Sequence, residues 1–250
     1  MGSRLPKRSP RRALRPRYGD RMDIRTVPNP LVRAGGRWLH RVNQRHPWSH
    51  NDHFHGWILQ RLPARRRRAL DVGCGAGLLL SRLRTRFGEV LGVDADAAMA
   101  ALSTERFAGD PAVSVRHARF EEVDGAFDTI TMVAVLHHMP LEPALRHASE
   151  LLESGGRLLV VGLARPDTVT DFIWDLGSAL LNPLVGLVRH PQPTAPAVDN
   201  PVDDGEPVMP VRDAAETFAK ISRTAREVLP GARIRRRLFF RYTLEWTRPT

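Results

Sequence analysis

Three alternating glycines after an aspartate are the residues of this 250-residue chain whose types and spacing most directly indicate chemistry. Asp71 ends an apolar run, and Gly73, Gly75 and Gly77 follow before a second apolar run begins. A glycine loop lets backbone N–H groups approach a ligand, and the N-terminus of a following helix favours a carboxylate or phosphate. A dinucleotide fingerprint would place its third glycine at Leu78. The sequence therefore predicts a small-molecule site, and its spacing favours a ligand other than a dinucleotide.

A second acidic residue, Asp94, ends the next apolar run, 17 residues after Gly77. This interval is long enough for one helix, which we expect over residues 78–87. A carboxylate at this point can accept hydrogen bonds from both ribose hydroxyls of an adenosine, each worth about 1.5–3 kcal/mol. Folds that bind NAD share this acid. Asp94 therefore predicts an adenosine ligand without deciding between families.

Two later segments complete a recognisable order of motifs. Residues 127–138 open with Phe-Asp and close with Leu-His-His, and residues 151–163 contain a Gly-Gly turn followed by an apolar strand. Together with the glycine loop and Asp94, these segments resemble the motifs of the class I S-adenosylmethionine-dependent methyltransferases of the small-molecule type. The resemblance covers about 100 residues of the chain. It implies S-adenosyl-L-methionine as the cofactor and S-adenosyl-L-homocysteine as the product.

The expected fold class is α/β, a doubly wound and Rossmann-like sheet. The chain is long enough to bury one large core, and strands alternate with helices along it. The resemblance implies seven strands in the order 3-2-1-4-5-7-6, the last one antiparallel. Asp213 is expected to cap a helix over residues 214–229, and a hairpin over 232–238 and 241–247 supplies the last two strands. We expect a disordered basic arm at residues 1–21 and a helical cap at residues 22–62. The methyltransferase core is expected over residues 63–250, with a lid insertion at about 168–210.

The resemblance also assigns cofactor contacts residue by residue. The three glycines would wrap the methionine end of the cofactor, Asp71 would hold its ammonium, and Asp94 its ribose. Relatives often place an acid that accepts from the adenine amino group where this chain has Arg119, and arginine cannot accept a hydrogen bond. Adenine would then be bound by the Phe120 backbone N–H and by packing. The candidate cofactor-binding residues are Asp71, Gly73, Cys74, Gly75, Gly77, Asp94, Ala95, Phe120 and Val133.

Methyl transfer requires little side-chain chemistry, because in-line positioning of the acceptor can supply about 7–11 kcal/mol of the barrier reduction. A base helps only when the acceptor must lose a proton early. His138 and His137 lie at the expected edge of the sheet, so they are the candidate catalytic residues, as a base or as groups that orient the acceptor. A purely structural role for both is the alternative.

The histidine-rich stretch at residues 50–55 contains an i, i+3 pair, but nothing completes a metal-ligand set, so we expect no metal. In related methyltransferases the helices before the glycine loop cover the cofactor, so these histidines would face the cofactor or substrate, or lie on the surface. Residues 168–188 are apolar but interrupted by Asp175, Asn182 and Pro183, which argues against a membrane span. As a lid, they indicate an apolar or amphipathic acceptor, or a dimer contact.

The net charge of +11 is unevenly distributed, since residues 1–21 alone carry +7. This arm lacks the apolar run of a signal peptide. It is an over-extended start before Met22, a solvated tail, or a tether to nucleic acid or an anionic membrane. Two further arginine-rich runs, at 65–68 and 233–241, are expected on solvated faces or edges. The only cysteine, Cys74, permits no intrachain disulfide, which is consistent with a cytoplasmic location.

The leading hypothesis is therefore a methyltransferase that acts on a small, apolar or amphipathic metabolite. One alternative is RNA methylation guided by the basic arm, although the Asp/Asn-Pro-Pro-Tyr loop of many amino-directed nucleic-acid methylases is absent. Another is a binding module that keeps the fold without catalysis. The expected partner is a small-molecule substrate. Nucleic-acid binding, weak membrane-surface contact, and monomer or homodimer remain open.

Overall fold

The computed structural model describes residues 50–167, 214–237 and 241–250. The predicted arm, most of the predicted cap, Asp213 and the predicted lid insertion lie outside these ranges.

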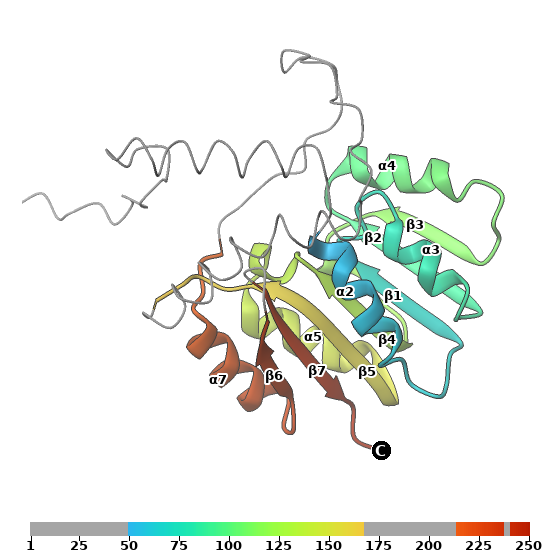
Figure 1. Ribbon diagram of the computed structural model, residues 1–250. Coiled ribbons are helices and arrows are strands. Elements are labelled where there is room, and N and C mark those ends of the chain that lie inside the picture. The colour runs from blue at the N-terminus through green and yellow to red at the C-terminus, as the bar shows by residue number, and fades with distance from the viewer. Residues whose placement is uncertain (1–49, 168–213, 238–240) are drawn as a thin grey trace, which may run out of the picture.

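Seven strands form one sheet in the order β3-β2-β1-β4-β5-β7-β6, as predicted (Figure 1). The first five run parallel, and β7 is antiparallel to both of its neighbours. The inner strands are buried almost throughout because both of their faces are covered by helices. The strands span β1 Arg68–Val72, β2 Glu89–Asp94, β3 Val113–His117, β4 Phe127–Val133, β5 Leu152–Leu163, β6 Arg233–Arg236 and β7 Arg241–Thr247.

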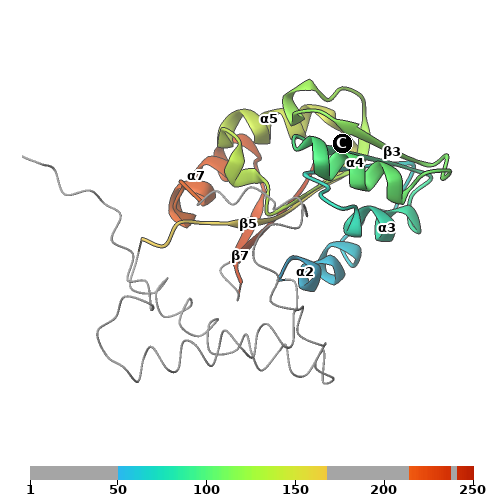
Figure 2. The ribbon, with the colours of Figure 1, turned by 90° about the horizontal axis from the view of Figure 1, so that it is seen from above.

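Helices cover the two faces of the sheet (Figure 2). Two of them, α2 and α3, lie on one side, and α5 and α7 lie on the other, while α4 packs on β2 and β3. Leucines and valines that alternate along β5 face the two sides in turn, so each side has its own apolar cluster. The helices are α2 His50–Leu59, α3 Leu78–Arg84, α4 Ala97–Arg106, α5 Leu141–Leu151 and α7 Phe218–Val228, with 3-10 turns η1 Phe120–Glu122 and η2 Leu136–His138.

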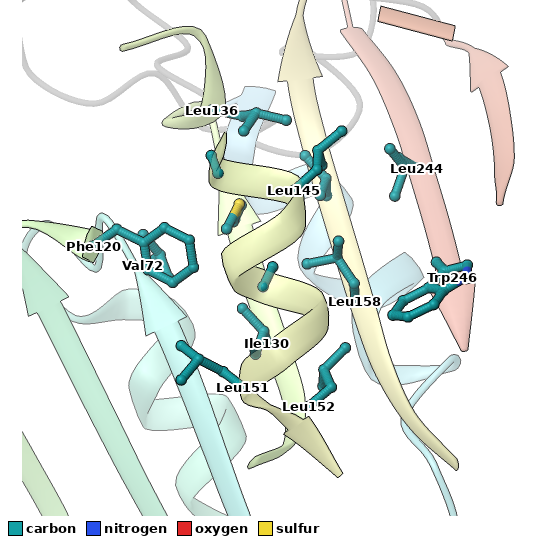
Figure 3. Packing of buried hydrophobic residues seen from close by; sticks show 14 of the residues in the cluster. Val72, Phe120, Ile130, Leu136, Leu145, Leu151, Leu152, Leu158, Leu244 and Trp246 are labelled. Atoms are coloured by element: carbon teal, nitrogen blue, oxygen red, sulfur yellow. The ribbon is translucent and has the colours of Figure 1, made fainter. Parts of the chain in front are cut away.

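The cluster on the α5 side is the larger core (Figure 3). Leu145 and Leu151 of α5 reach down to Ile130 of β4 and Leu158 of β5, and Trp246 of β7 extends the cluster toward the sheet edge. All of these side chains are buried. This packing holds rigid the strand ends on which the candidate site is built.

Three predicted boundaries were wrong, each for a local reason. The helix expected over 214–229 begins at Phe218, because the Thr217 side chain caps it and Glu216 accepts a hydrogen bond from the Arg165 N–H at 2.7 Å. The strand expected over 232–238 is β6, residues 233–236. The helix expected over 78–87 ends at Arg84 in a turn. The expected hairpin and its place in the sheet are confirmed.

The arginine run at 65–68 is not only a solvated edge. The buried Asp128 carboxylate accepts from Arg65 Nε at 2.5 Å and from the backbone N–H groups of Arg67 and Arg68 at 2.6 and 3.1 Å. Burial alone would raise the pKa of Asp128, but these donors outweigh it and hold the pKa below its usual range. The aspartate of the Phe-Asp motif, at the start of β4, therefore connects β4 to the start of β1 through hydrogen bonds.

Candidate functional site

The glycine loop joins β1 to α3 at the carboxyl edge of the parallel strands. Gly73, Gly75 and Gly77 have φ values of 69°, 52° and 78°, in the left-handed region that side chains disfavour. A Cβ atom on Gly73 would lie 2.6 Å from Cγ2 of Val135, and one on Gly77 would lie 2.7 Å from Cε2 of Phe107. Both conformation and space therefore require glycine, and the loop presses directly against the segment that follows β4.

Asp94, at the end of β2, holds the glycine loop in place. Its carboxylate accepts from the Gly75 N–H at 2.8 Å and from the Asp96 N–H at 2.9 Å. The carbonyl of Val93 accepts from the N–H groups of Gly73 and Cys74. Since a carboxylate has about four acceptor positions, Asp94 still has room for ribose hydroxyls. Sequence reasoning predicted a ligand contact at Asp94 but missed this loop-shaping role.

Asp71 is a buried carboxyl beneath the loop. It is 2% exposed and accepts from the Thr131 hydroxyl at 2.7 Å. Burial, with a smaller contribution from the charge of Asp94, raises the pKa of Asp71 to about 7, against the opposing effect of the Thr131 hydrogen bond. None of the described cationic side chains forms an ion pair with it. A cationic ligand group would therefore be well matched to this site.

Cys74 packs away from the open side of the loop. Burial, followed by the charges of Asp71 and Asp94, raises the pKa of the thiol to about 12, so it stays protonated. Its Sγ would lie 3.0 Å from a Cβ on Gly92, which explains the glycine within β2. Only the Cys74 backbone is left to face a ligand.

On the predicted adenine side, only the backbone of Phe120 can meet a ligand. The Phe120 ring is 4% exposed and packs against His147 in the core, with 4.8 Å between ring centroids. It therefore cannot pack on an adenine, and only its backbone remains for the predicted contact. Arg119 is mostly exposed and pairs with Glu121 at 3.7 Å. Ala95 directly follows β2, and its carbonyl lies 3.2 Å from Nε2 of His117.

The Leu-His-His motif was expected to end the fourth strand, but the two candidate histidines lie outside that strand. β4 ends at Val133, and Ala134 turns the chain with a left-handed φ of 55°, so that His137 and His138 lie in η2. Their rings are 4.0 Å apart between centroids. The turn moves both side chains beyond the sheet edge, where they can face a pocket.

That pocket has a volume of about 250 Å³ and lies between η2, the end of β5 and the start of α7. Mostly apolar side chains line it, and the polar groups among them are the two histidines, Glu216 and Tyr242. Burial raises the pKa of Tyr242 above its usual value, so its phenol is neutral at physiological pH. Sequence reasoning missed Glu216 and Tyr242, because residues 79 and 105 positions after His137 become its neighbours only in the fold.

The predicted histidine cluster at residues 50–55 is only partly described. His55 is 3% exposed and belongs to the interior, not to the surface. Among the described residues, no group of three His, Cys, Asp or Glu side chains is placed to hold a metal ion. Within the same residues, no helix is long and apolar enough to cross a membrane.

The strand order, the glycine loop after β1 and the acid ending β2 define a class I S-adenosylmethionine-dependent methyltransferase fold. A family model described as a methyltransferase domain matches residues 70–160. An uncharacterised methyltransferase of Mycobacterium bovis is 31% identical over 211 residues, covering 81% of this chain and 98% of the relative. The chain therefore belongs to the methyltransferase family, whose class I members take their methyl group from S-adenosylmethionine.

More distant similarities agree with this assignment. The ubiquinone biosynthesis O-methyltransferase of Pseudomonas aeruginosa is 30% identical over 116 residues, which cover 44% of this chain and 50% of that protein. The YcgJ protein of Bacillus subtilis has a TM-score of 0.51 and 21% identity, covering 74% of this chain and 71% of that structure. A methyltransferase of Aquifex aeolicus has a TM-score of 0.51 and 13% identity, over 85% and 97% of the two chains. The two structures support the fold alone.

Proposed function

We propose that this methyltransferase acts on a small, apolar or amphipathic metabolite, which binds in the pocket beside His137 and His138. The observation that carries this proposal is the contact between Gly73 and Val135. It places the loop that would hold the donor directly beside η2, whose residues line the pocket. A pocket of about 250 Å³ with mostly apolar walls suits a small molecule rather than a polymer.

The donor side fits the residues present. The cofactor supplies an already activated methyl group on a sulfonium. Asp71 would bind the ammonium group, because a buried carboxyl with a raised pKa gains most from a cation placed beside it. Asp94 would accept from the ribose hydroxyls while it continues to hold the loop. The backbone at Gly73, Gly75 and Val133, at the open strand ends, would complete the contacts.

On the acceptor side, the chain mainly needs to orient one nucleophilic atom and exclude water. His138 is exposed at the edge of η2, where it could accept a proton from, or donate a hydrogen bond to, the acceptor. A histidine side chain can either accept or donate a proton, so this residue type is suited to either role. Tyr242 lines the same pocket as a neutral phenol and can donate a hydrogen bond. The partial similarity to an O-methyltransferase agrees with an oxygen acceptor.

The direct test combines the purified protein, labelled S-adenosylmethionine and a metabolite extract. We expect label to pass to one small-molecule product, and His138→Ala to lower turnover by about 100-fold or more if the imidazole acts as a base. Tyr242→Phe is the matched probe of hydrogen bonding because it keeps the ring. Unchanged turnover in His138→Ala, with normal cofactor binding by calorimetry, would refute the base. Label passing only to RNA would refute the acceptor class.

A further inference from the structure

The positive charge of the folded part is concentrated in α7 and β6. Residues 214–241 contain eight Lys or Arg and two Glu, a net charge of +6, whereas the chain outside this segment and outside residues 1–21 sums to −2. In Figure 1, α7 and β6 stand together at the sheet edge opposite β3. One edge of an otherwise nearly neutral domain is therefore strongly cationic.

One side of this edge is an open groove along α7. Arg223 and Arg226 are exposed and line it together with Phe218 and one carboxylate, that of the exposed Glu227, and its volume is about 610 Å³. Arg236 of β6 lies over the Phe218 ring, 4.4 Å from its centroid, so the strand contributes a cation to the same groove. The groove therefore combines three guanidinium groups with one carboxylate, which leaves it net positive.

The other side of the edge is also cationic. Arg233 and Arg235 alternate with Ile234 and Arg236 along β6, so they point to the face opposite α7 and are exposed. Burial, and then the charges of Arg235 and Arg61, lowers the pKa of Arg237 on this side. Glu245 lies opposite Arg233 in the β6–β7 ladder, but its carboxylate pairs with Arg61 at 3.3 Å and with Arg157 at 3.6 Å.

Few acidic side chains of the described residues pair with the cations of this edge. Lys220 pairs with Glu216 at 2.7 Å. Within the described part of the chain, no acidic side chain forms an ion pair with the four exposed arginines, which are Arg223, Arg226, Arg233 and Arg235. An anionic partner would therefore meet these four guanidinium groups, two on each side of the sheet edge.

We propose that this α7–β6 edge, defined by Arg223, Arg226, Arg233, Arg235 and Arg236, docks the protein onto an anionic phospholipid surface. Guanidinium groups match phosphate oxygens, and each one near such a surface raises affinity about five-fold. Single-stranded RNA is recognised largely by stacking on exposed aromatic rings. Among the described residues, the exposed large hydrophobic side chains are leucines, and the one aromatic ring of the groove, Phe218, is half-buried with Arg236 over it. A surface of phosphates without bases is the better match.

The placement of the edge adds a consequence. Ile221 of α7 lines the acceptor pocket, while Phe218 and Ser222 of the same helix line the cationic groove. Docking through the groove would bring the pocket close to the lipid headgroups, where an amphipathic acceptor is concentrated. This consequence rests on the proposed function, whereas the docking itself does not.

The test is co-sedimentation of the full chain with phosphatidylcholine vesicles that contain or lack phosphatidylglycerol. The variant Arg223→Gln/Arg226→Gln/Arg235→Gln removes three charges from the edge. The matched control, Arg67→Gln/Arg82→Gln/Arg86→Gln, removes three exposed charges elsewhere and leaves the N-terminal arm unchanged. We expect the edge variant to bind the anionic vesicles about 100-fold more weakly, with a much smaller change in the control.

Equal loss of binding in both variants would overturn the proposal, since general charge would then explain the affinity. Unchanged vesicle binding in the edge variant would overturn it as well. Selective loss of binding to an RNA oligonucleotide, with vesicle binding retained, would assign the edge to nucleic acid instead. S-adenosylhomocysteine binding, which we expect to be unchanged in both variants, reports separately on the methyltransferase site.

Discussion

Replacement of Asp71 by asparagine is expected to change stability and cofactor affinity in opposite directions. Burial raises the pKa of this carboxyl to about 7. An acid with an ordinary pKa near 4 when unfolded then binds more protons in the folded state between about pH 4 and pH 7, so the free energy of unfolding falls as pH rises through this window. Three pKa units correspond to about 4 kcal/mol, and asparagine avoids this loss because it never ionises.

Cofactor binding should respond in the other direction. If Asp71 holds the ammonium group, its replacement removes a charge-assisted hydrogen bond worth about 1.5–3 kcal/mol, or about 10- to 150-fold in Kd. Urea unfolding near pH 5 and near pH 8 measures the stability, and calorimetry with S-adenosylhomocysteine measures the affinity. Asp71→Asn should be more stable than the wild type by up to about 4 kcal/mol near pH 8, and by far less near pH 5.

Two results would refute this reasoning separately. A stability difference that is equal near pH 5 and near pH 8 would show that Asp71 does not carry a raised pKa. Unchanged affinity for S-adenosylhomocysteine would show that it does not bind the ammonium group. Asp128→Asn serves as a control for the sign, because the lowered pKa of Asp128 makes its contribution fall as pH falls.

Further predictions concern residues that position the site. Gly73→Ala should lower the free energy of unfolding, measured in urea, by about 2–4 kcal/mol, because its φ is left-handed and a Cβ there would clash with Val135. Gly109 also has a left-handed φ but open space around it, so Gly109→Ala should lower the free energy of unfolding by only about 1–2 kcal/mol. Equal losses in the two variants would exclude the clash. Asp128→Ala should lower the free energy of unfolding by about 3–5 kcal/mol near pH 7. This difference from the wild type should shrink as pH falls below about 4, because the wild-type carboxylate is then protonated and loses the same interaction. A difference that does not change with pH would contradict an ionised Asp128. Gly162→Ala should lower the free energy of unfolding by about 1–3 kcal/mol, because a Cβ there would overlap the Tyr242 ring. If this overlap is the cause, the same substitution in a Tyr242→Ala background should leave the free energy of unfolding unchanged.

Much of this fold could be predicted because its signals are local. The glycine loop, Asp94 and the Gly155–Gly156 turn lie at fixed places in a strand–helix alternation, and parallel strands joined by helices have few possible arrangements. The boundaries were predicted less well. Glu216 lies in an extended segment that contacts Arg165, a pairing between residues 51 positions apart that no helix-capping rule reveals.

The candidate site was predictable on its donor side and only partly on its acceptor side. Asp71 and Asp94 follow from their positions at strand ends, but the pKa of Asp71 depends on burial by neighbours from other strands. The pocket depends on Ala134, whose left-handed backbone is rare outside glycine and asparagine and has no marker in the sequence. The turn at Ala134 separates His137 and His138 from β4, so sequence reasoning found the right residues on the wrong element.

The late start of α7 links the two sides of the acceptor region. Because Glu216 pairs with Arg165 at the end of β5, the helix begins at Phe218, and its first turns lie between the pocket and the cationic edge. Had the helix begun at residue 214, Glu216 would belong to its first turn and would lose the extended pairing that directs it to the pocket mouth. The same short segment therefore sets the pocket wall on one side and the orientation of Arg223 and Arg226 on the other. A change that shifts this start, such as Thr217→Ala at the cap, should affect acceptor binding and vesicle binding together, whereas S-adenosylhomocysteine affinity should stay unchanged because the glycine loop lies on other elements.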